Sequence, residues 1–508
     1  MGAVVLTLAC NLMAVDPPRT VLSADFEAGD ALTGWGPAQD GVRIVTDDAG
    51  SRVLLVERAA ETGQGSTGVR RELPIEELRG RRLVCTARVK AEDVAKPPHP
   101  WSGVKFMVHI AAPGGDQWPQ RDLPFGTFDW REVRYITAVP DDATKVELVL
   151  GLESTTGRAW FDDVSIAVLP TPDERPAPTE VYTGHSQPRL RGAMIGQVTA
   201  DDLLEFGLRW KANHVRWQLT WGGFPRSPAD KGDLAAYDKW LNGELDRLQS
   251  LLPVCERAGL MVLIDLHTPP GGRDDRNVCM LFEDKAYQEK FLEVWRRIAE
   301  RFRDAKMVWG YDLVNEPVEG APPDGLLGWQ DLAQKAAELV RSIDPQHAII
   351  VEPEPWGGLD ALWNLVPLTV AGVVYSVHMY VPHQFTHQGV YDSPVGIGYP
   401  GDIAGKHWDR DALRKVFQPV VDYQRTFGVR IYVGEFSAIR WAPDDSAYRY
   451  LSDVIDILEE NGWDWAYHAF REWNGWSVEH GPDKDDNERS PTETGRERLL
   501  RSWYAKNQ

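Results

Sequence analysis

Two glutamates stand where a carboxyl group could do chemistry. Glu316 lies in DLVNEP and Glu435 in YVGEF, each directly after an apolar run that is typical of a buried β-strand. Two carboxyl groups at one place can divide a reaction between them, one as proton donor and the other as nucleophile or base. Cleavage of a glycosidic bond needs this pair, because the leaving oxygen takes up a proton while a second group acts at the anomeric carbon.

The segments around these glutamates belong to a longer alternation of strand-like and helix-like stretches. Between the strand-like runs, apolar residues recur at spacings of three and four, as in amphipathic helices. The strand-like runs are RLRGAMIG, NHVRWQL, MVLIDLH, MVWGYDL, AIIVEPE, VVYSVHMY, RIYVGEF and WDWAYHAF. Eight strands that each precede a helix predict an α/β fold, a (β/α)₈ TIM barrel over residues 189–508. An open doubly wound sheet is the alternative, but no glycine-rich phosphate loop follows the first strand.

The predicted barrel would bring the carboxyl ends of its strands to one rim, where barrel enzymes carry their active sites. Nearly every strand-like run ends in polar or aromatic residues. In chain order these include Arg216, His267, Asn315, Glu316, His378, Tyr380, Glu435 and, after the last strand, Trp473. We expect Arg216 to keep one glutamate ionised, while partial burial lets the other retain its proton.

The region before the barrel has a different pattern. Residues 20–169 contain strand-like runs only, among them RLVCTARVKA and KVELVLGLES, in which apolar and polar residues alternate. This pattern predicts an antiparallel β-sandwich. The proline- and charge-rich run that begins with PTPDERPAP predicts an extended linker over residues 170–188.

The composition narrows the class of partner. Lys and Arg number 55 against 76 Asp and Glu, which gives a net charge of −21 and disfavours nucleic acid and anionic membranes. The 21 tryptophans would suit stacking on sugar rings, because an indole is flat, but large barrels also use many tryptophans in their cores. No Cys/His spacing suggests zinc. We therefore expect a monomer that acts on a polysaccharide and needs no cofactor for catalysis.

The motifs HVRW, LIDLH, DLVNEP, SVHMY and YVGEF resemble, in order and spacing, those of glycoside hydrolase family 5. This is the large cellulase family of retaining (β/α)₈ enzymes, and the resemblance covers residues 189–505. It implies that Glu316 is the general acid/base and Glu435 the nucleophile. It also implies that Arg216 and Tyr380 contact the nucleophile and that His378 orients the acid/base. Asn315 and His267 would bind the sugar, and Trp473 would form a platform under it.

Other tryptophans are candidates for sugar contacts. Trp476 is close enough in sequence to compete with Trp473 for the platform at the cleavage site. Trp221, Trp356 and Trp441 follow the second, fifth and seventh predicted strands, where rim loops begin, so we expect them in outer sugar subsites. A packing role is an equal alternative for each of these three.

The N-terminal region resembles the jelly-roll carbohydrate-binding modules that accompany cellulases and xylanases. The resemblance rests on DFE at residues 25–27 and on RAWFDDVSI at residues 158–166. It implies a structural calcium, with Glu27 and Asp162 as candidate ligands. Trp101 and Trp118, in or beside Pro-rich loops, could bind glycan, and loop packing or a purely structural domain is the alternative.

Residues 1–15 form an apolar, signal-like segment that predicts secretion, either extracellular or periplasmic. No Lys or Arg precedes its apolar core, so the signal is incomplete. No other segment approaches the ~20 apolar residues of a membrane helix.

The leading functional hypothesis is an endo-β-1,4-glucanase (cellulase, EC 3.2.1.4) that works by double displacement. The first alternative is the same mechanism on β-mannan, xyloglucan, β-1,3-glucan or a glycolipid, because loop residues at the rim select the sugar. The second alternative, from another class, is a non-catalytic carbohydrate-binding protein, against which the two intact glutamates argue.

Overall fold

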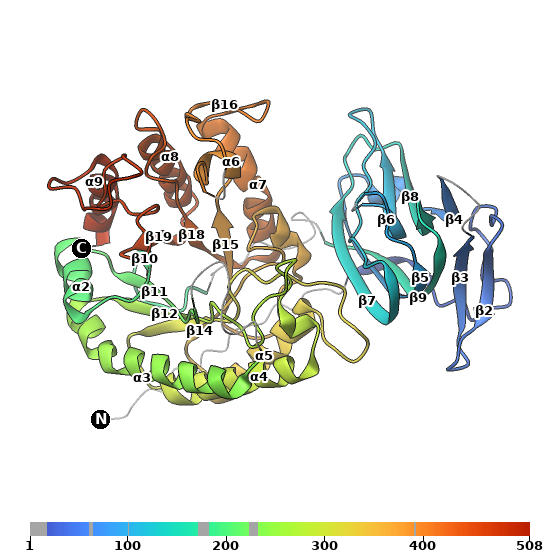
Figure 1. The fold of residues 1–508 in the computed structure, drawn as a ribbon, viewed down its shortest axis with the longest axis horizontal. Helices are drawn as coiled ribbons and strands as arrows, with labels where there is room; N and C mark the ends of the chain where they lie inside the picture. Colours follow the sequence, from blue (N-terminus) through green and yellow to red (C-terminus); the bar gives the residue numbers. More distant parts are fainter. Residues whose placement is uncertain are drawn as a thin grey trace.

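The computed structural model describes residues 18–59, 65–99, 101–170, 182–222, 232–390 and 393–507. Two bodies lie side by side in Figure 1: the strands β1 to β9, drawn blue to teal, and a barrel with its helices, drawn green to red. The signal-like segment 1–15 and residues 171–181 of the predicted linker lie outside the described residues. Within the described ranges, no helix is both long and apolar enough to cross a membrane.

The N-terminal body contains two antiparallel sheets, as the alternating sequence pattern predicts. One sheet has the order β2-β3-β9-β5-β7 with β1 paired to β9, and the other has the order β4-β8-β6. The strands are β1 (Arg19–Ala24), β2 (Val42–Thr46), β3 (Arg52–Arg58), β4 (Ser66–Glu72), β5 (Arg82–Val94), β6 (Gly103–Ala111), β7 (Gly126–Ala138), β8 (Lys145–Glu153) and β9 (Gly157–Val168), with a short helix α1 (Ile75–Leu78) before β5. Membership in the carbohydrate-binding modules stays a prediction.

Strand β5 connects the core of this body with the barrel. Leu83, Cys85 and Ala87 alternate along one face of the strand and are buried in the core between the sheets. Val84, on the opposite face, packs with Leu169 against the core of the barrel. The strand is therefore covered on both sides, and the sandwich and the barrel share apolar surface.

The second body is a closed parallel barrel, which confirms the predicted TIM barrel and excludes the open sheet. Its strand order is β10-β11-β12-β13-β14-β15-β18-β19. The strands are β10 (Arg191–Ile195), β11 (His214–Gln218), β12 (Met261–Asp265), β13 (Val308–Asp312), β14 (Ala348–Val351), β15 (Val373–Met379), β18 (Arg430–Phe436) and β19 (Asp464–Phe470). Each sits within a predicted strand-like run.

Helices surround the barrel and account for the apolar periodicity between the strands. They are α2 (Ala200–Leu204) with the π-helical turn η3 (Glu205–Arg209), α3 (Leu234–Ala258), α4 (Lys285–Phe302), α5 (Trp329–Ile343), α6 (His383–Thr386), α7 (Arg410–Phe427), α8 (Ser446–Glu460) and α9 (Gly495–Tyr504). Short 3₁₀ turns are η5 (Met280–Phe282), η6 (Asp360–Asn364) and η7 (Ala505–Asn507), and the long loop after β15 carries α6 and the hairpin β16 (Gly401–Ile403) and β17 (Lys406–Trp408).

Several helix ends are specified by single residues. The side chains of Asp233, Asp409 and Thr494 accept hydrogen bonds from backbone N–H groups in the first turns of α3, α7 and α9. Gly259 and Gly428 end α3 and α7 with φ of 70° and 63°, a left-handed conformation that glycine adopts without strain. The three N-terminal caps set where these helices begin, and the two glycines set where α3 and α7 return the chain to β12 and β18.

Candidate active site

Arg216, on β11, lies fully buried at the centre of the barrel and faces four carboxyl groups. Its Nη1 is 2.6 Å from Oε1 of Glu435, and its Nη2 is 2.7 Å from Oε1 of Glu352. Asp312 accepts a bond from Nε at 3.0 Å, and an oxygen of Asp265 lies 3.2 Å from Nη2. The predicted contact between Arg216 and Glu435 is therefore present, as part of a larger buried cluster.

One guanidinium cannot balance four buried negative charges, so the acids must differ in protonation. Burial and the neighbouring Glu352 raise the pKa of Asp312 well above its usual range, so we expect Asp312 to hold a proton. Burial would also raise the pKa of Glu435, but His378, His468 and Arg216 outweigh it and hold that pKa well below its usual range. The predicted nucleophile is therefore ionised.

The second carboxylate oxygen of Glu435 has two further partners. The hydroxyl of Tyr380 donates to Oε2 at 2.8 Å, and Nδ1 of His468 lies 3.2 Å from the same oxygen. The other ring nitrogen of His468 lies 2.8 Å from Glu472. Burial alone would lower the pKa of His468, but Glu472 and Glu435 raise it to about 10. A second cation therefore lies beside the predicted nucleophile.

Glu316 follows β13 and is partly exposed at the carboxyl end of the barrel strands. Its carboxylate is 2.8 Å from Nδ1 of His378, and its backbone N–H donates to Glu352 at 2.8 Å. The Glu316 side chain keeps 24% of its surface exposed, against 4% for Glu435. The backbone of Glu316 has a φ of 46°, in the left-handed region, and Arg273 donates to its carbonyl at 2.8 Å. The predicted acid/base thus faces solvent and the predicted nucleophile does not.

The two glutamates come from β13 and β18, which are separated in the barrel by β14 and β15, and His378 on β15 lies between them. His378 on β15 pairs in register with Glu435 on β18, and single ligand-type atoms of Glu316, His378 and Glu435 all lie within 4.8 Å of one another. Carboxyl groups this close leave no room for a water between them and the sugar, which favours direct attack by one carboxylate. A metal ion would bind poorly between Glu316, His378 and Glu435. Glu352 and Glu435 raise the pKa of His378 well above its usual value, so a proton occupies the ring nitrogen that would bind the metal.

Asn315 and His267, the predicted sugar contacts, are hydrogen-bonded to each other. Oδ1 of Asn315 accepts from Arg216 at 3.0 Å, and its Nδ2 is 3.4 Å from Nε2 of His267. Nδ1 of His267 lies 2.9 Å from Asp265 and donates to it, so Nε2 is the acceptor for the amide. These bonds fix the orientation of both side chains at the rim.

The predicted tryptophan platforms differ in exposure. Trp473 and Trp356 are each 43% exposed, whereas Trp476 is 7% exposed and packs 5.9 Å from the ring of Tyr380. Trp221 stacks on Trp240, and Trp441 meets Trp473 edge to face with 6.0 Å between ring centroids. Of the two competitors at the cleavage site, Trp473 has the accessible face and Trp476 lies beneath it, 5.4 Å away.

Five residues of this cluster received no role from the sequence: Asp265, Asp312, Glu352, His468 and Glu472. The signal for Glu352 and Glu472 was present, since both stand at strand ends with the predicted site residues. Asp312 and His468 lie inside strand-like runs. A single polar residue in such a run does not show that its side chain points to the same centre as those of other strands.

The candidate calcium ligands lie in the N-terminal body. Glu27 accepts hydrogen bonds from the Ser51 hydroxyl at 2.7 Å and from the backbone of Arg52 at 3.0 Å. Asp162 is buried, and its burial raises its pKa to about 6. Among the described residues, no group of three potential ligand side chains includes either acid. The calcium site stays a prediction.

The barrel region matches a known enzyme family. Residues 175–474 match the cellulase family, glycosyl hydrolase family 5. The chain is similar to endoglucanase C of Acetivibrio thermocellus, with 27% identity over 242 residues, 42% of this chain and 69% of that protein. Cellodextrinase A of Ruminococcus flavefaciens is 24% identical over 271 residues, which are 52% of this chain and 79% of that protein. Among solved structures, Thermotoga maritima Cel5A with cellobiose is 24% identical, with a TM-score of 0.48 over 62% of this chain and 96% of that one.

Proposed function

Since the chain belongs to glycosyl hydrolase family 5, the cellulase family, we propose that this glycoside hydrolase is an endo-β-1,4-glucanase that retains anomeric configuration. The observation that carries the mechanism is the pair of glutamates with ligand atoms within 4.8 Å, one ionised against Arg216 and the other partly exposed. Endoglucanase C and cellodextrinase A, named among its relatives, support a β-1,4-glucan as substrate.

In the first step, Glu435 attacks the anomeric carbon and forms a covalent glycosyl ester. Glu316 gives its proton to the leaving glycosidic oxygen as that bond breaks, so the departing chain leaves as an alcohol. Tyr380 and Arg216 direct the carboxylate through hydrogen bonds to its two oxygens. Asn315 is oriented to bind the sugar hydroxyl next to the reacting carbon, a contact that strengthens in the transition state.

In the second step, water replaces the departed chain. Glu316, now a carboxylate, takes a proton from that water, and the water oxygen attacks the anomeric carbon while the bond to Glu435 breaks. His378, protonated between Glu316 and Glu352, stabilises the carboxylate form of Glu316 in this step. Two inversions at one carbon return the original configuration.

The proposal is tested with a panel of carboxymethyl-cellulose, mannan, xyloglucan and laminarin, and with the anomer of the first product measured by NMR. We expect reducing ends from carboxymethyl-cellulose and a β-product. Faster release from mannan, xyloglucan or laminarin would select the alternative sugars on the same machinery. Binding to insoluble polysaccharide without any reducing-end release would favour a non-catalytic binding protein.

A second proposed function is glycan binding by the N-terminal body. A groove of about 920 Å³ crosses the sheet β4-β8-β6, and Trp101 and Trp118 are among its lining residues. Their rings are 59% and 45% exposed. His99 and His109 stack on them at centroid distances of 4.6 and 3.8 Å, which fixes the two indoles and leaves a face of each for a sugar.

Isothermal titration with cello-oligosaccharides tests the groove. We expect W101A and W118A each to weaken binding at this site, because each removes a rigid apolar platform. F125A is the matched control, since Phe125 is 54% exposed but does not line the groove. Equal affinities for all three variants and the unmodified protein would contradict glycan binding here.

A further inference from the structure

We infer that Arg121, a residue of the N-terminal body, is a positioning residue for the active site in the barrel. It lies between β6 and β7 and holds the loops that follow β13 and β14, which carry Glu316 and Trp356. The N-terminal body is then a working part of the catalytic unit. Only the kinetic test of this inference depends on the proposed hydrolysis.

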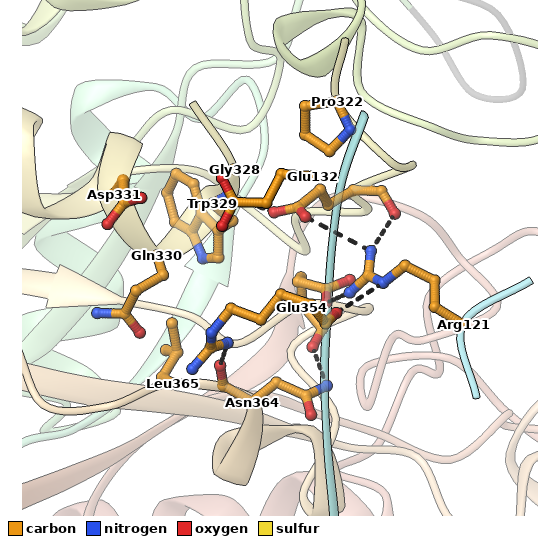
Figure 2. Close-up of a pocket in the computed structure, with 12 residues that line it drawn as sticks. Arg121, Glu132, Pro322, Gly328, Trp329, Gln330, Asp331, Glu354, Asn364 and Leu365 are labelled. Carbon is orange, nitrogen blue, oxygen red and sulfur yellow. Dashed lines mark hydrogen bonds and ion pairs between the residues drawn. The ribbon is translucent and has the colours of Figure 1, made fainter. Parts of the chain in front are cut away.

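The guanidinium of Arg121 reaches across to both loops at once. In Figure 2 its side chain points toward Glu354, whose Oε1 accepts from Nη2. Nη1 donates to the backbone carbonyls of Glu319 at 2.9 Å and of Gly320 at 3.1 Å. Nε donates to the carbonyl of Arg134 on β7 at 2.9 Å, which ties the head group to its own sheet.

The two acids that face Arg121 are almost without solvent. Each side chain is 9% exposed, and that of Arg121 is 15% exposed. Burial raises the pKa of Glu319 to about 7 while Arg121 opposes that rise, and Glu354 adds a like charge. Without Arg121, two buried carboxyl groups would lie close together with less positive charge near them, so the loops would have reason to separate.

Glu319 connects this contact to the predicted acid/base. It lies three residues after Glu316, and its Oε2 accepts from the backbone N–H of Trp329. The indole of Trp329 donates to the carbonyl of Glu352 at 2.7 Å. The carboxylate of Glu352 in turn accepts from the backbone of Glu316 at 2.8 Å. A short chain of bonds therefore runs from Arg121 to the residue that must protonate the leaving oxygen.

Glu354 connects the same contact to the loop that carries the exposed Trp356. It stands between Glu352 and the exposed Trp356, and its backbone carbonyl accepts from Asn364 at 2.7 Å. The backbone N–H of Trp356 donates to the carbonyl of Pro317, next to Glu316, at 3.1 Å. The two loops held by Arg121 are thus also bonded to each other beside the reacting centre.

Other contacts keep the two bodies together without Arg121. Arg131 donates to the carbonyl of Ala321, which is buried in the sandwich core, and the backbone of Asp324 donates to Trp130 at 2.9 Å. Arg88 pairs with Asp324 at 2.7 Å at the exposed edge of the same interface. A substitution at Arg121 should therefore alter loop position while the bodies stay docked.

The test compares R121K and R121Q with R88Q, which removes a charge from the edge of the same interface. Each variant is assayed on cellotetraose, whose leaving group needs a proton, and on 2,4-dinitrophenyl β-cellobioside, whose leaving group needs none. We expect R121Q to lose about 10- to 100-fold in kcat/KM on cellotetraose and much less in kcat/KM on the activated substrate. The ratio kcat/KM reports the first step, in which only the leaving group of cellotetraose needs the proton of Glu316. R121K, which keeps the charge but lacks the fork geometry, should fall between R121Q and the unmodified enzyme.

Amide hydrogen exchange of residues 316–329 and 352–364 gives a readout that is independent of turnover. We expect faster exchange there in R121Q and unchanged exchange in R88Q. Equal losses on both substrates, or unchanged exchange in these loops, would overturn the inference. If the unmodified protein hydrolyses neither substrate, the proposed function fails, and exchange alone then decides the role of Arg121.

Discussion

At the scale of single residues, Arg216 has the most demanding environment in the barrel. It is fully buried and contacts Glu435, Glu352, Asp312 and Asp265. A buried cation with hydrogen-bonded acids is costly to remove, because the acids that remain have neither water nor a partner. We therefore expect Arg216 to stabilise the folded state and to keep the predicted nucleophile charged.

We expect R216A to lower the free energy of unfolding by about 3–5 kcal/mol and to abolish measurable turnover. Urea unfolding and reducing-end release measure the two effects. The control is R209A, whose ion pair with Glu205 is exposed and should contribute about 0–1 kcal/mol. A stable R216A variant that keeps turnover would contradict this role.

E435Q should lower kcat by at least about a thousandfold, which corresponds to about 4 kcal/mol of lost transition-state stabilisation. The amide keeps the shape of the side chain but is not a nucleophile, so no glycosyl ester forms. E289Q, on the exposed face of α4, is the control. Near-normal turnover of E435Q on carboxymethyl-cellulose would rule out Glu435 as the nucleophile.

His468 offers a test by pH. Its pKa of about 10 keeps it charged throughout the working range, and that charge lowers the pKa of Glu435. Its loss in H468Q should raise the pKa of Glu435, so the acidic limb of kcat/KM moves to higher pH. H387Q is the control, since burial lowers the pKa of His387 to about 3 and leaves it uncharged in that range. Identical acidic limbs for H468Q and the unmodified enzyme would exclude this role.

At the scale of elements, the loop after β19 carries two tryptophans with different expected roles: Trp476 supports the site from below and Trp473 contacts the sugar. Trp476 is buried below Tyr380 and His468, and Trp473 is exposed above it. We expect W476A to lose about 3–5 kcal/mol of unfolding free energy, because it leaves a cavity under the site. W473A should change stability by about 0.5 kcal/mol or less while raising KM. Thermal unfolding and initial rates measure both, and the reverse pattern would assign the platform to Trp476.

Element patterns also show how far the sequence could predict the fold. The eight barrel strands lie inside the predicted runs, because a strand buried on both faces is continuously apolar and is easily recognised. The residues of the long insertion after β15 show no such pattern. Its short helix α6 and the hairpin β16–β17 have three or four residues each, too few to give a periodic signal.

At the scale of the whole molecule, the interface between the two bodies contains acids that respond to pH. Burial raises the pKa of Glu319 in the folded protein to about 7, above the ~4.3 expected when unfolded. The folded state therefore binds more protons between these values, and its stability falls as pH rises from about 4.5 to 7. E319Q removes that titration.

We accordingly expect the midpoint of urea unfolding to fall less steeply from pH 5 to 7 in E319Q than in the unmodified protein. E338Q, an exposed glutamate on α5, is the control and should keep the original slope. Parallel curves for E319Q and the unmodified protein would show that the buried acid does not titrate in this range.

The sequence by itself determined the two architectures and nominated both glutamates, because periodicity and strand-end position are local properties of the chain. The contact of Arg216 with Glu435 was implied by the family resemblance, whereas the residue pattern indicated only that Arg216 keeps one glutamate ionised. Only the tertiary structure decided that Asp312 and His468 belong to the same cluster, since charges separated by over a hundred residues interact through space. It also decided that Arg121, outside the barrel, contacts the loops of Glu316 and Trp356, which no pattern within either body reveals. The pair of glutamates is readable from the chain, whereas the groups that set their charge and position are assembled by folding.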